Sequence, residues 1–202
     1  MRVGLRSLSE GLAEKISRHL VAAGLALDED PELALAHAKF ARALAPRIAV
    51  LREAVGVAAY RAGEFTTALS ELRAVRRMTG DASYLPVLAD CERGLGRPER
   101  ALALVRDPDA RKLGPAERVE LAIVESGARR DRGEMEAAVV ALQGPALRRQ
   151  EVQPWTARLW YAYAAALADA GRMDEARKWF GAVAAIDDDG ETDAEERLEE
   201  LA

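Results

Sequence analysis

Apolar residues recur along the chain at the three-to-four-residue spacing of amphipathic helices, and short polar stretches with Gly or Pro interrupt them. Each interruption ends one predicted helix and starts another, because Gly breaks a helix while Pro is tolerated in its first turn. The pattern predicts helices over 8–26, 31–44, 47–61, 64–79, 82–94, 97–105, 115–131, 134–142, 154–170 and 173–186, and a last one from about 193. An all-α fold is therefore expected.

A unit recurs along the chain: a Gly, replaced by Glu29 in the first copy, is followed five residues later by an Ala. These alanines are Ala34, Ala68, Ala101, Ala138 and Ala176. Seven residues before each turn position stands a small residue, at Ala22, Gly56, Ala89, Ser126 and Ala164, and four residues after each Ala stands an apolar one, at Ala38, Leu72, Val105, Leu142 and Phe180. The period of about 34 residues predicts a helical hairpin per unit, with small residues where its two helices touch.

A lone hairpin cannot bury its apolar face, so successive hairpins are expected to stack into a right-handed superhelix. We place the repeats at about 15–48, 49–81, 82–115, 119–152 and 157–190, within one domain spanning 1–202. The remaining residues, 191–202, are expected to form an acidic capping helix. Thr192 and Glu195 have the spacing of a capping box that satisfies two free backbone amides.

Three stretches carry a resemblance to a known family: Gly56 through Ala68 to Val75, Leu88 through Gly96 to Leu102, and Trp160 through Gly171 to Phe180. They resemble tetratricopeptide repeats (TPR), and the chain as a whole is similar to small bacterial-type TPR proteins. The resemblance implies a right-handed α-solenoid of about five TPR-like helical hairpins with a C-terminal acidic capping helix. It also implies a non-enzymatic adaptor or assembly scaffold that binds a peptide or protein segment.

In a stacked array the first helices line the concave side and present one stripe of side chains at helical spacing. The predicted partner-binding groove consists of His19, Glu53, Tyr60, Arg61, Asp90, Arg93, Arg130, Arg158 and Tyr161. This mixture suits a peptide with apolar and acidic side chains. The partner's identity is not predicted, and self-association stays open.

Composition disfavours a general nucleic-acid binder, because the net charge is −5. The middle repeats are nevertheless locally basic, through Arg73, Arg76, Arg77, Arg93, Arg97, Arg100 and Arg106. An RNA-associated protein using these arginines is therefore an alternative, although no aromatic residues interleave with them for stacking on bases. No run of 18 apolar residues occurs, so we expect a cytoplasmic chain without a membrane partner.

Candidate chemistry is sparse: we predict no catalytic residue, no cofactor and no metal site, with an undetected enzyme as the remaining alternative. His19 and His37 are assigned to different repeats, and the single cysteine, Cys91, is expected to be buried. The segment 187–196 places Asp187, Asp189, Gly190, Asp193 and Glu196 at EF-hand offsets. Its first ligand position is Ala185, so a solvated acidic turn is favoured, and cation binding there stays open.

Overall fold

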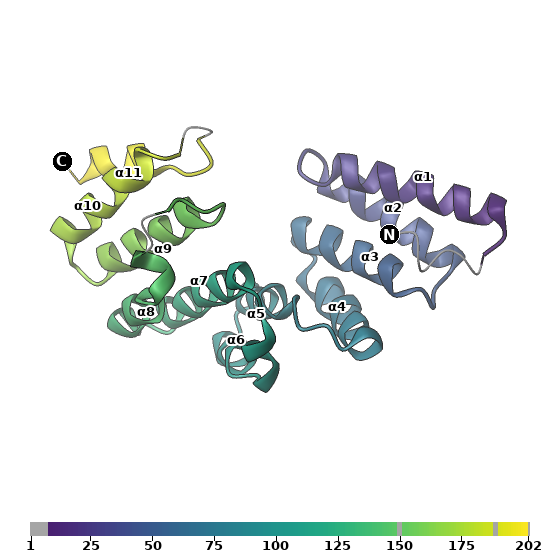
Figure 1. Cartoon of the computed structure of the whole chain (residues 1–202), viewed down its shortest axis with the longest axis horizontal. Helices are drawn as coiled ribbons and strands as arrows, with labels where there is room; N and C mark the ends of the chain where they lie inside the picture. The colour runs from purple at the N-terminus through teal and green to yellow at the C-terminus, as the bar shows by residue number, and fades with distance from the viewer. Residues whose placement is uncertain (1–7, 149–150, 188–189, 202) are drawn as a thin grey trace. The chain divides into compact units, whose positions relative to one another are not determined.

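The computed structural model describes residues 8–148, 151–187 and 190–201, and every regular element in these ranges is helical (Figure 1). The α-helices are α1 (Glu10–Ala26), α2 (Pro31–Leu44), α3 (Ala49–Arg61), α4 (Phe65–Thr79), α5 (Leu85–Gly94), α6 (Pro98–Val105), α7 (Pro115–Asp131), α8 (Met135–Leu142), α9 (Thr156–Asp169), α10 (Met173–Ala184) and α11 (Ala194–Glu200). Two short 3₁₀ turns, η1 (Pro108–Lys112) and η2 (Pro145–Arg148), lie in the proline-containing insertions. The all-α prediction is confirmed for the described residues.

Consecutive helices pack as pairs, α1 with α2, α3 with α4, α7 with α8 and α9 with α10. Four turn glycines end the first helix of a predicted hairpin, namely Gly63, Gly96, Gly133 and Gly171, and all have φ between +69° and +77°. Only Gly adopts this left-handed conformation without steric cost, which is why the turn is readable in the sequence. In the first hairpin the side chain of Asp30 caps α2 instead, accepting a hydrogen bond from the amide of Leu33 at 3.0 Å.

The repeat positions form the packed interior. All five repeat alanines have no exposed surface, and the apolar residues that follow in α4 and α10, Leu72 and Phe180, are equally buried. Gly56 of α3 lies directly against Leu72, since a Cβ at this glycine would fall 2.6 Å from the Leu72 Cγ. Val105 of α6 is only partly buried. The periodicity therefore identified buried positions, and at Gly56 and Leu72 it identified a contact between the helices of a pair.

The chain divides into two compact units, residues 1–96 and 97–202. In the first unit, α2 packs on α3 and α4 on α5. In the second, α6 packs on α7, α8 on α9 and α10 on α11. The division falls at the Gly96 turn inside the predicted repeat 82–115. A single superhelical domain over 1–202, and its handedness, stay predictions.

The turn before α11 differs from the prediction. The N-cap of α11 is Asp193, whose side chain makes no cap hydrogen bond, and the hydroxyl of Thr192 accepts the amide of Ala194 at 3.4 Å. Thr192 thus satisfies one amide at this end of the helix, but not as the N-cap of a capping box with Glu195. The hydroxyl of Thr192 also donates to Oδ2 of Asp187 at 2.6 Å. The same carboxylate accepts the backbone amides of Glu191 and Thr192, at 2.9 and 2.8 Å. A charged carboxylate is a stronger acceptor than a hydroxyl, and it organises this turn from the end of α10.

The last helix, α11, covers part of the second unit. Ala194 is 1% exposed, and Leu198 and Leu201 pack against the core of the second unit beside Phe180. The outward side chains of α11, including Glu195, Glu196 and Glu199, are exposed. This short helix thus covers the last hairpin with an apolar face and leaves an acidic face in solvent.

Candidate partner-binding surface

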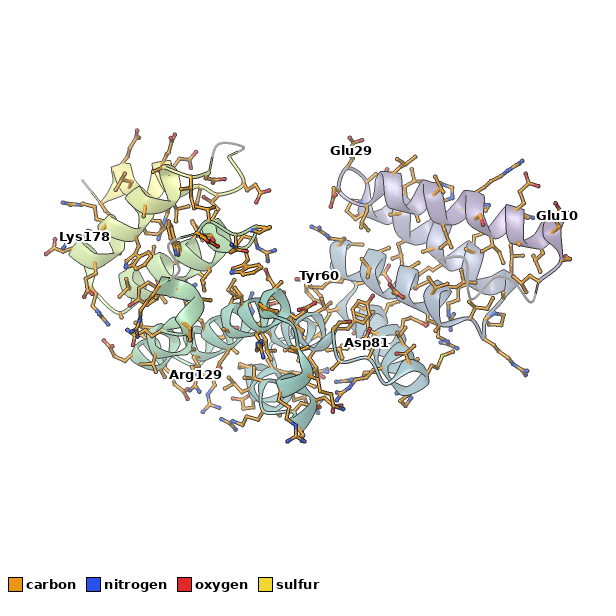
Figure 2. All side chains as sticks on the ribbon, viewed as in Figure 1. Glu10, Glu29, Tyr60, Asp81, Arg129 and Lys178 are labelled. Atoms are coloured by element: carbon orange, nitrogen blue, oxygen red, sulfur yellow. The ribbon has the colours of Figure 1, made fainter. Side chains whose placement is uncertain are left out.

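All nine residues of the predicted groove lie on the first helices of the hairpins. In the first unit they are His19 on α1, Glu53, Tyr60 and Arg61 on α3, and Asp90 and Arg93 on α5; in the second they are Arg130 on α7, and Arg158 and Tyr161 on α9. Figure 2 labels Tyr60 among the side chains of the first unit.

In the first unit, the predicted residues of α3 bond to the next first helix, α5. The hydroxyl of Tyr60 donates to Oδ2 of Asp90 at 2.7 Å, and Nε of Arg93 donates to Oδ1 of the same carboxylate at 3.0 Å. Glu53 accepts a hydrogen bond from the hydroxyl of Tyr84, at the start of α5. Burial and then this bond raise the pKa of Tyr84. The prediction therefore brought together residues that are in contact, 30 positions apart in the sequence.

In the second unit, α7 and α9 exchange two ion pairs. Nε of Arg130 on α7 donates to Asp169 on α9 at 2.6 Å, while Arg158 on α9 donates to Glu120 on α7 at 2.7 Å. The two pairs lie at opposite ends of α9. Together they bond the first helices of the last two hairpins to each other along their length.

Tyr161 on α9 forms a hydrogen bond to the start of the last helix, α11. Its hydroxyl donates to Asp193, the N-cap residue of α11, and its ring packs edge-on against Phe180 with ring centroids 5.6 Å apart. Burial first, and then the bond to the carboxylate, raise the pKa of Tyr161 to about 12. The hydrogen bond between the Tyr161 phenol and the Asp193 carboxylate thus holds α11 against α9.

Two arginines of the predicted groove keep more than half of their side-chain surface in solvent. Arg61 is 53% exposed and pairs with Asp28 at 3.2 Å, and Arg158 is 56% exposed. An ion pair in solvent contributes at most about 1 kcal/mol, because water screens it and two long side chains must be held still.

His19 stands apart from the other predicted groove residues. Its Nδ1 lies 2.9 Å from Nδ1 of His37 on α2, and its ring packs on Phe40 with centroids 4.3 Å apart. The two histidines therefore face each other within the first hairpin, and their assignment to different repeats is wrong. Positions 19 and 37 are symmetric about the turn between α1 and α2, a signal that could have revealed the pair.

One arginine of the basic middle repeats, Arg73, and two arginines before them, Arg42 and Arg52, pair with carboxylates that sequence reasoning missed. Arg73 pairs with Glu92, which is 1% exposed, and Glu71 receives Arg42 at 3.0 Å and Arg52 at 2.8 Å. Buried carboxylates require such partners, since an unpaired charge inside a protein is costly. These ion pairs join α4 to α2, α3 and α5, and they leave Arg73 less available to a polyanion.

Cys91 is fully buried, as predicted, and burial first and its acidic neighbours second raise the pKa of its thiol to about 12. A thiol that stays protonated is a poor nucleophile. No three His, Cys, Asp or Glu side chains in the described ranges gather as a metal site. In the acidic turn, Asp187 is occupied by the bonds given above, and Asp189 lies outside the described residues.

No family model matches the chain, and no curated protein matches it. Within the part of the chain that the structure describes, no helix combines the length and apolar character needed to cross a membrane.

Proposed function

We propose that this chain is a non-enzymatic adaptor or assembly scaffold, a TPR-like right-handed α-solenoid of about five hairpins that binds a peptide or protein segment along its first helices. One observation carries the proposal. In each unit the predicted stripe residues bond the first helix of one hairpin to the first helix of the next, as Tyr60 does with Asp90 and Arg130 with Asp169. Within each unit, first helices that share such bonds present their side chains in a row, on which an extended ligand can lie.

The chemistry of the row supports a partner with acidic and apolar side chains. Arg61 and Arg158 offer exposed guanidinium groups whose present ion pairs are weak. Tyr60 and Tyr161 add aromatic surface held in place by their hydrogen bonds. A preformed surface loses little side-chain entropy on binding, and Tyr and Arg are common anchors at interfaces.

The test is affinity capture from the native cell with the full chain as bait, followed by mass spectrometry. Arg61→Glu and Arg158→Glu reverse charges on the row while removing only solvent-exposed ion pairs, so the fold is expected to survive. Lys39→Glu is the matched control, because Lys39 is 48% exposed, pairs with Glu64 at 3.1 Å and lies on a second helix. Circular dichroism checks that helicity is equal in all three variants.

We expect the two row variants to lose the captured protein and the Lys39 variant to retain it. If the captured protein binds the Arg61 and Arg158 variants as tightly as the parent but does not bind the Lys39 variant, the binding site lies on the second helices. Capture of generic RNA, with an affinity that falls steeply with salt, would replace the adaptor by the RNA-associated alternative. A turnover found in a broad substrate screen would contradict the non-enzymatic assignment.

A further inference from the structure

One face of α1 is apolar and exposed, although the equivalent face is at least partly covered in every other first helix. The residues 13, 10 and 9 positions before the repeat alanine are Val21, Gly24 and Leu25 in α1, and Val55, Ala58 and Ala59 in α3. In α3 all three are at most 1% exposed, whereas Val21 is 57% and Leu25 78% exposed. At the same positions of α5, α7 and α9, every residue is buried or half-buried. The exposed apolar face therefore belongs to the first hairpin alone.

A neighbour that α1 lacks explains the difference. Each of these two first helices packs on the second helix of its own hairpin, α1 on α2 and α3 on α4. α3 also packs on α2, the second helix of the preceding hairpin, and α1 has no such helix before it among the described residues. Val21, Gly24 and Leu25 thus form the face on which a further helix would pack. A Cβ added to Gly24 would meet nothing within 4 Å, so a helix has room to approach closely there.

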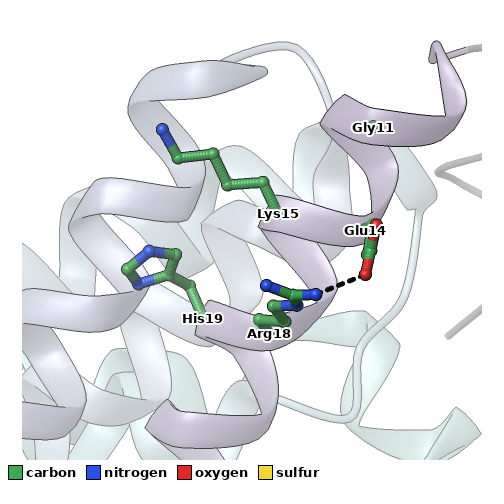
Figure 3. A pocket seen from close by; sticks show the side chains of 5 residues that line it. All are labelled: Gly11, Glu14, Lys15, Arg18 and His19. Carbon is green, nitrogen blue, oxygen red and sulfur yellow. Dashed lines mark hydrogen bonds and ion pairs between the residues drawn. The ribbon is translucent and has the colours of Figure 1, made fainter.

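The charges beside this face identify the helix that fits it. Arg18, Val21, Leu25 and Asp28 recur at spacings of three, four and three residues, as in the seam between two paired helices. Arg18 pairs with Glu14 on its own helix (Figure 3), and Asp28, in the turn after α1, pairs with Arg61. Both ion pairs are solvent-exposed and therefore weak. When the seam meets a second copy of itself running antiparallel, with Val21 opposite Leu25, Arg18 lies opposite Asp28 of the other copy.

We propose that α1 pairs antiparallel with α1 of a second copy of this chain, about a two-fold axis. The axis repeats each contact, so the dimer has two Val21–Leu25 contacts at its centre and two Arg18–Asp28 ion pairs at its edges. Head-to-tail stacking of copies would need a bare face on the last hairpin too, but α11 packs on α10 there. The surface is separate from the predicted groove, since His19 faces His37 of α2.

The size of the contact predicts a weak dimer. A single helix face supplies far fewer than the roughly 20 to 30 residues a side of a standard interface, so association belongs to the transient class. Sedimentation equilibrium of the full chain, over about 1 to 500 µM, covers the affinities of that class. We expect a reversible monomer–dimer equilibrium without larger species, because a contact between identical faces closes at two chains.

Val21→Glu tests the apolar centre of the dimer. The substitution places two carboxylates between the paired helices and should make the chain monomeric, while the exposed position leaves the fold intact. Val140→Glu is the matched control, because Val140 is also an exposed valine on a helix, α8, but lies outside the seam. Its dimerisation should equal that of the parent. Circular dichroism checks that helicity is the same in the parent and both variants.

A charge exchange tests the register of the two helices. Arg18→Asp and Asp28→Arg each turn both flanking ion pairs into contacts between like charges, so each variant alone should associate at least about tenfold more weakly than the parent. Mixing the two variant chains restores opposite charges at both contacts. The mixture should therefore form a one-to-one dimer with the affinity of the parent.

Four results would overturn the proposal. The first is a chain that stays monomeric at about 500 µM, and the second is association that Val21→Glu leaves unchanged. The third is growth beyond dimers with rising concentration, which would show head-to-tail stacking in place of the two-fold pair. The fourth is a mixture of the Arg18 and Asp28 variants that associates no more tightly than either alone, which would show that these side chains do not face each other.

Discussion

At the scale of single residues, Gly56 marks a close approach between the paired helices α3 and α4. A Cβ there would lie 2.6 Å from both Cγ and Cδ2 of Leu72, and Leu72 has no exposed surface into which it could turn. The glycine of α3 and the leucine of α4 therefore set the spacing of the second hairpin. Any side chain at position 56 must push the two helices apart.

Gly56→Ala is expected to destabilise the protein by about 1 to 3 kcal/mol, because overpacking outweighs the better helix propensity of alanine. Gly24→Ala is the matched control: this glycine is also helical, but a Cβ added to it would meet nothing within 4 Å. There the alanine should stabilise, by up to about 1 kcal/mol. Urea unfolding of both variants gives the comparison, and equal effects of the two substitutions would show that the α3–α4 contact is loose.

Tyr161 makes stability depend on pH at the alkaline end. Its pKa is raised to about 12 in the folded protein, from an ordinary value of 10.0, so its contribution is complete below pH 10 and is lost as pH rises through about 12. Tyr161→Phe lacks the hydrogen bond to Asp193 and should be less stable than the parent at pH 8, by about 1 kcal/mol. This difference should shrink between pH 10 and 12, since the parent must then place a phenolate beside a carboxylate. Thermal melts at three pH values measure it, and a difference that stays constant with pH would count against the bond.

Residue burial was readable from the sequence, whereas residue partners were not. The repeat alanines are buried because burial follows local periodicity, which a single helix already expresses. The bond between Tyr60 and Asp90 depends on the distance and rotation between two helices 30 residues apart, and no local pattern encodes these. For the same reason, the sequence placed Asp90 and Arg93 in the predicted groove but did not predict that their side chains hydrogen-bond to each other.

At the scale of helices, prediction succeeded best where proline or glycine marks an end. The bounds of α2 and α7 coincide with the predicted 31–44 and 115–131, and both helices begin with proline. The start of α5 was placed three residues early. There, Asp81 accepts the amide of Ser83 at 2.8 Å and donates its own amide to the hydroxyl of Thr79, which holds these residues in a turn. Short polar side chains compete with the helix in a way that periodicity cannot detect.

The turn between α10 and α11 offers a test of which side chain organises it. The hydroxyl of Thr192, and then the amide of Glu191, hold the pKa of Asp187 below its ordinary value. The carboxylate therefore contributes stability above that ordinary value and loses it as pH falls through the lowered one. Asp187→Asn should lower the melting temperature at pH 7 and reduce its dependence on acid.

Glu195→Gln is the control for this turn, because a capping box would need that side chain and the structure does not use it at the N-cap. We expect its melting temperature to match the parent at every pH. Should Glu195→Gln be the more damaging of the two substitutions, the capping box predicted from the sequence would be right and the turn assigned to Asp187 wrong. Differential scanning calorimetry from pH 2.5 to 7 resolves the two cases.

At the scale of the whole molecule, stacked hairpins and a single globular core predict different responses to a core cavity. In a solenoid each hairpin contacts only its neighbours, so stability is a sum of local terms and damage stays local. Leu51 of α3 has no exposed surface and belongs to a core cluster with Ile16 and Leu20 of α1. Leu159 of α9 is 2% exposed, in the cluster of the second unit.

Leu51→Ala and Leu159→Ala should each cost about 2 to 5 kcal/mol, since each leaves a cavity in a close-packed cluster. Hydrogen exchange under native conditions locates the loss. With Leu51→Ala we expect faster exchange in α1 to α4 and unchanged protection in α9 to α11; with Leu159→Ala the affected helices should be α7 to α11, and α1 and α2 should keep their protection. If either substitution lowers protection equally in all the helices, the chain unfolds as one body, and the proposed solenoid is replaced by a single cooperative core.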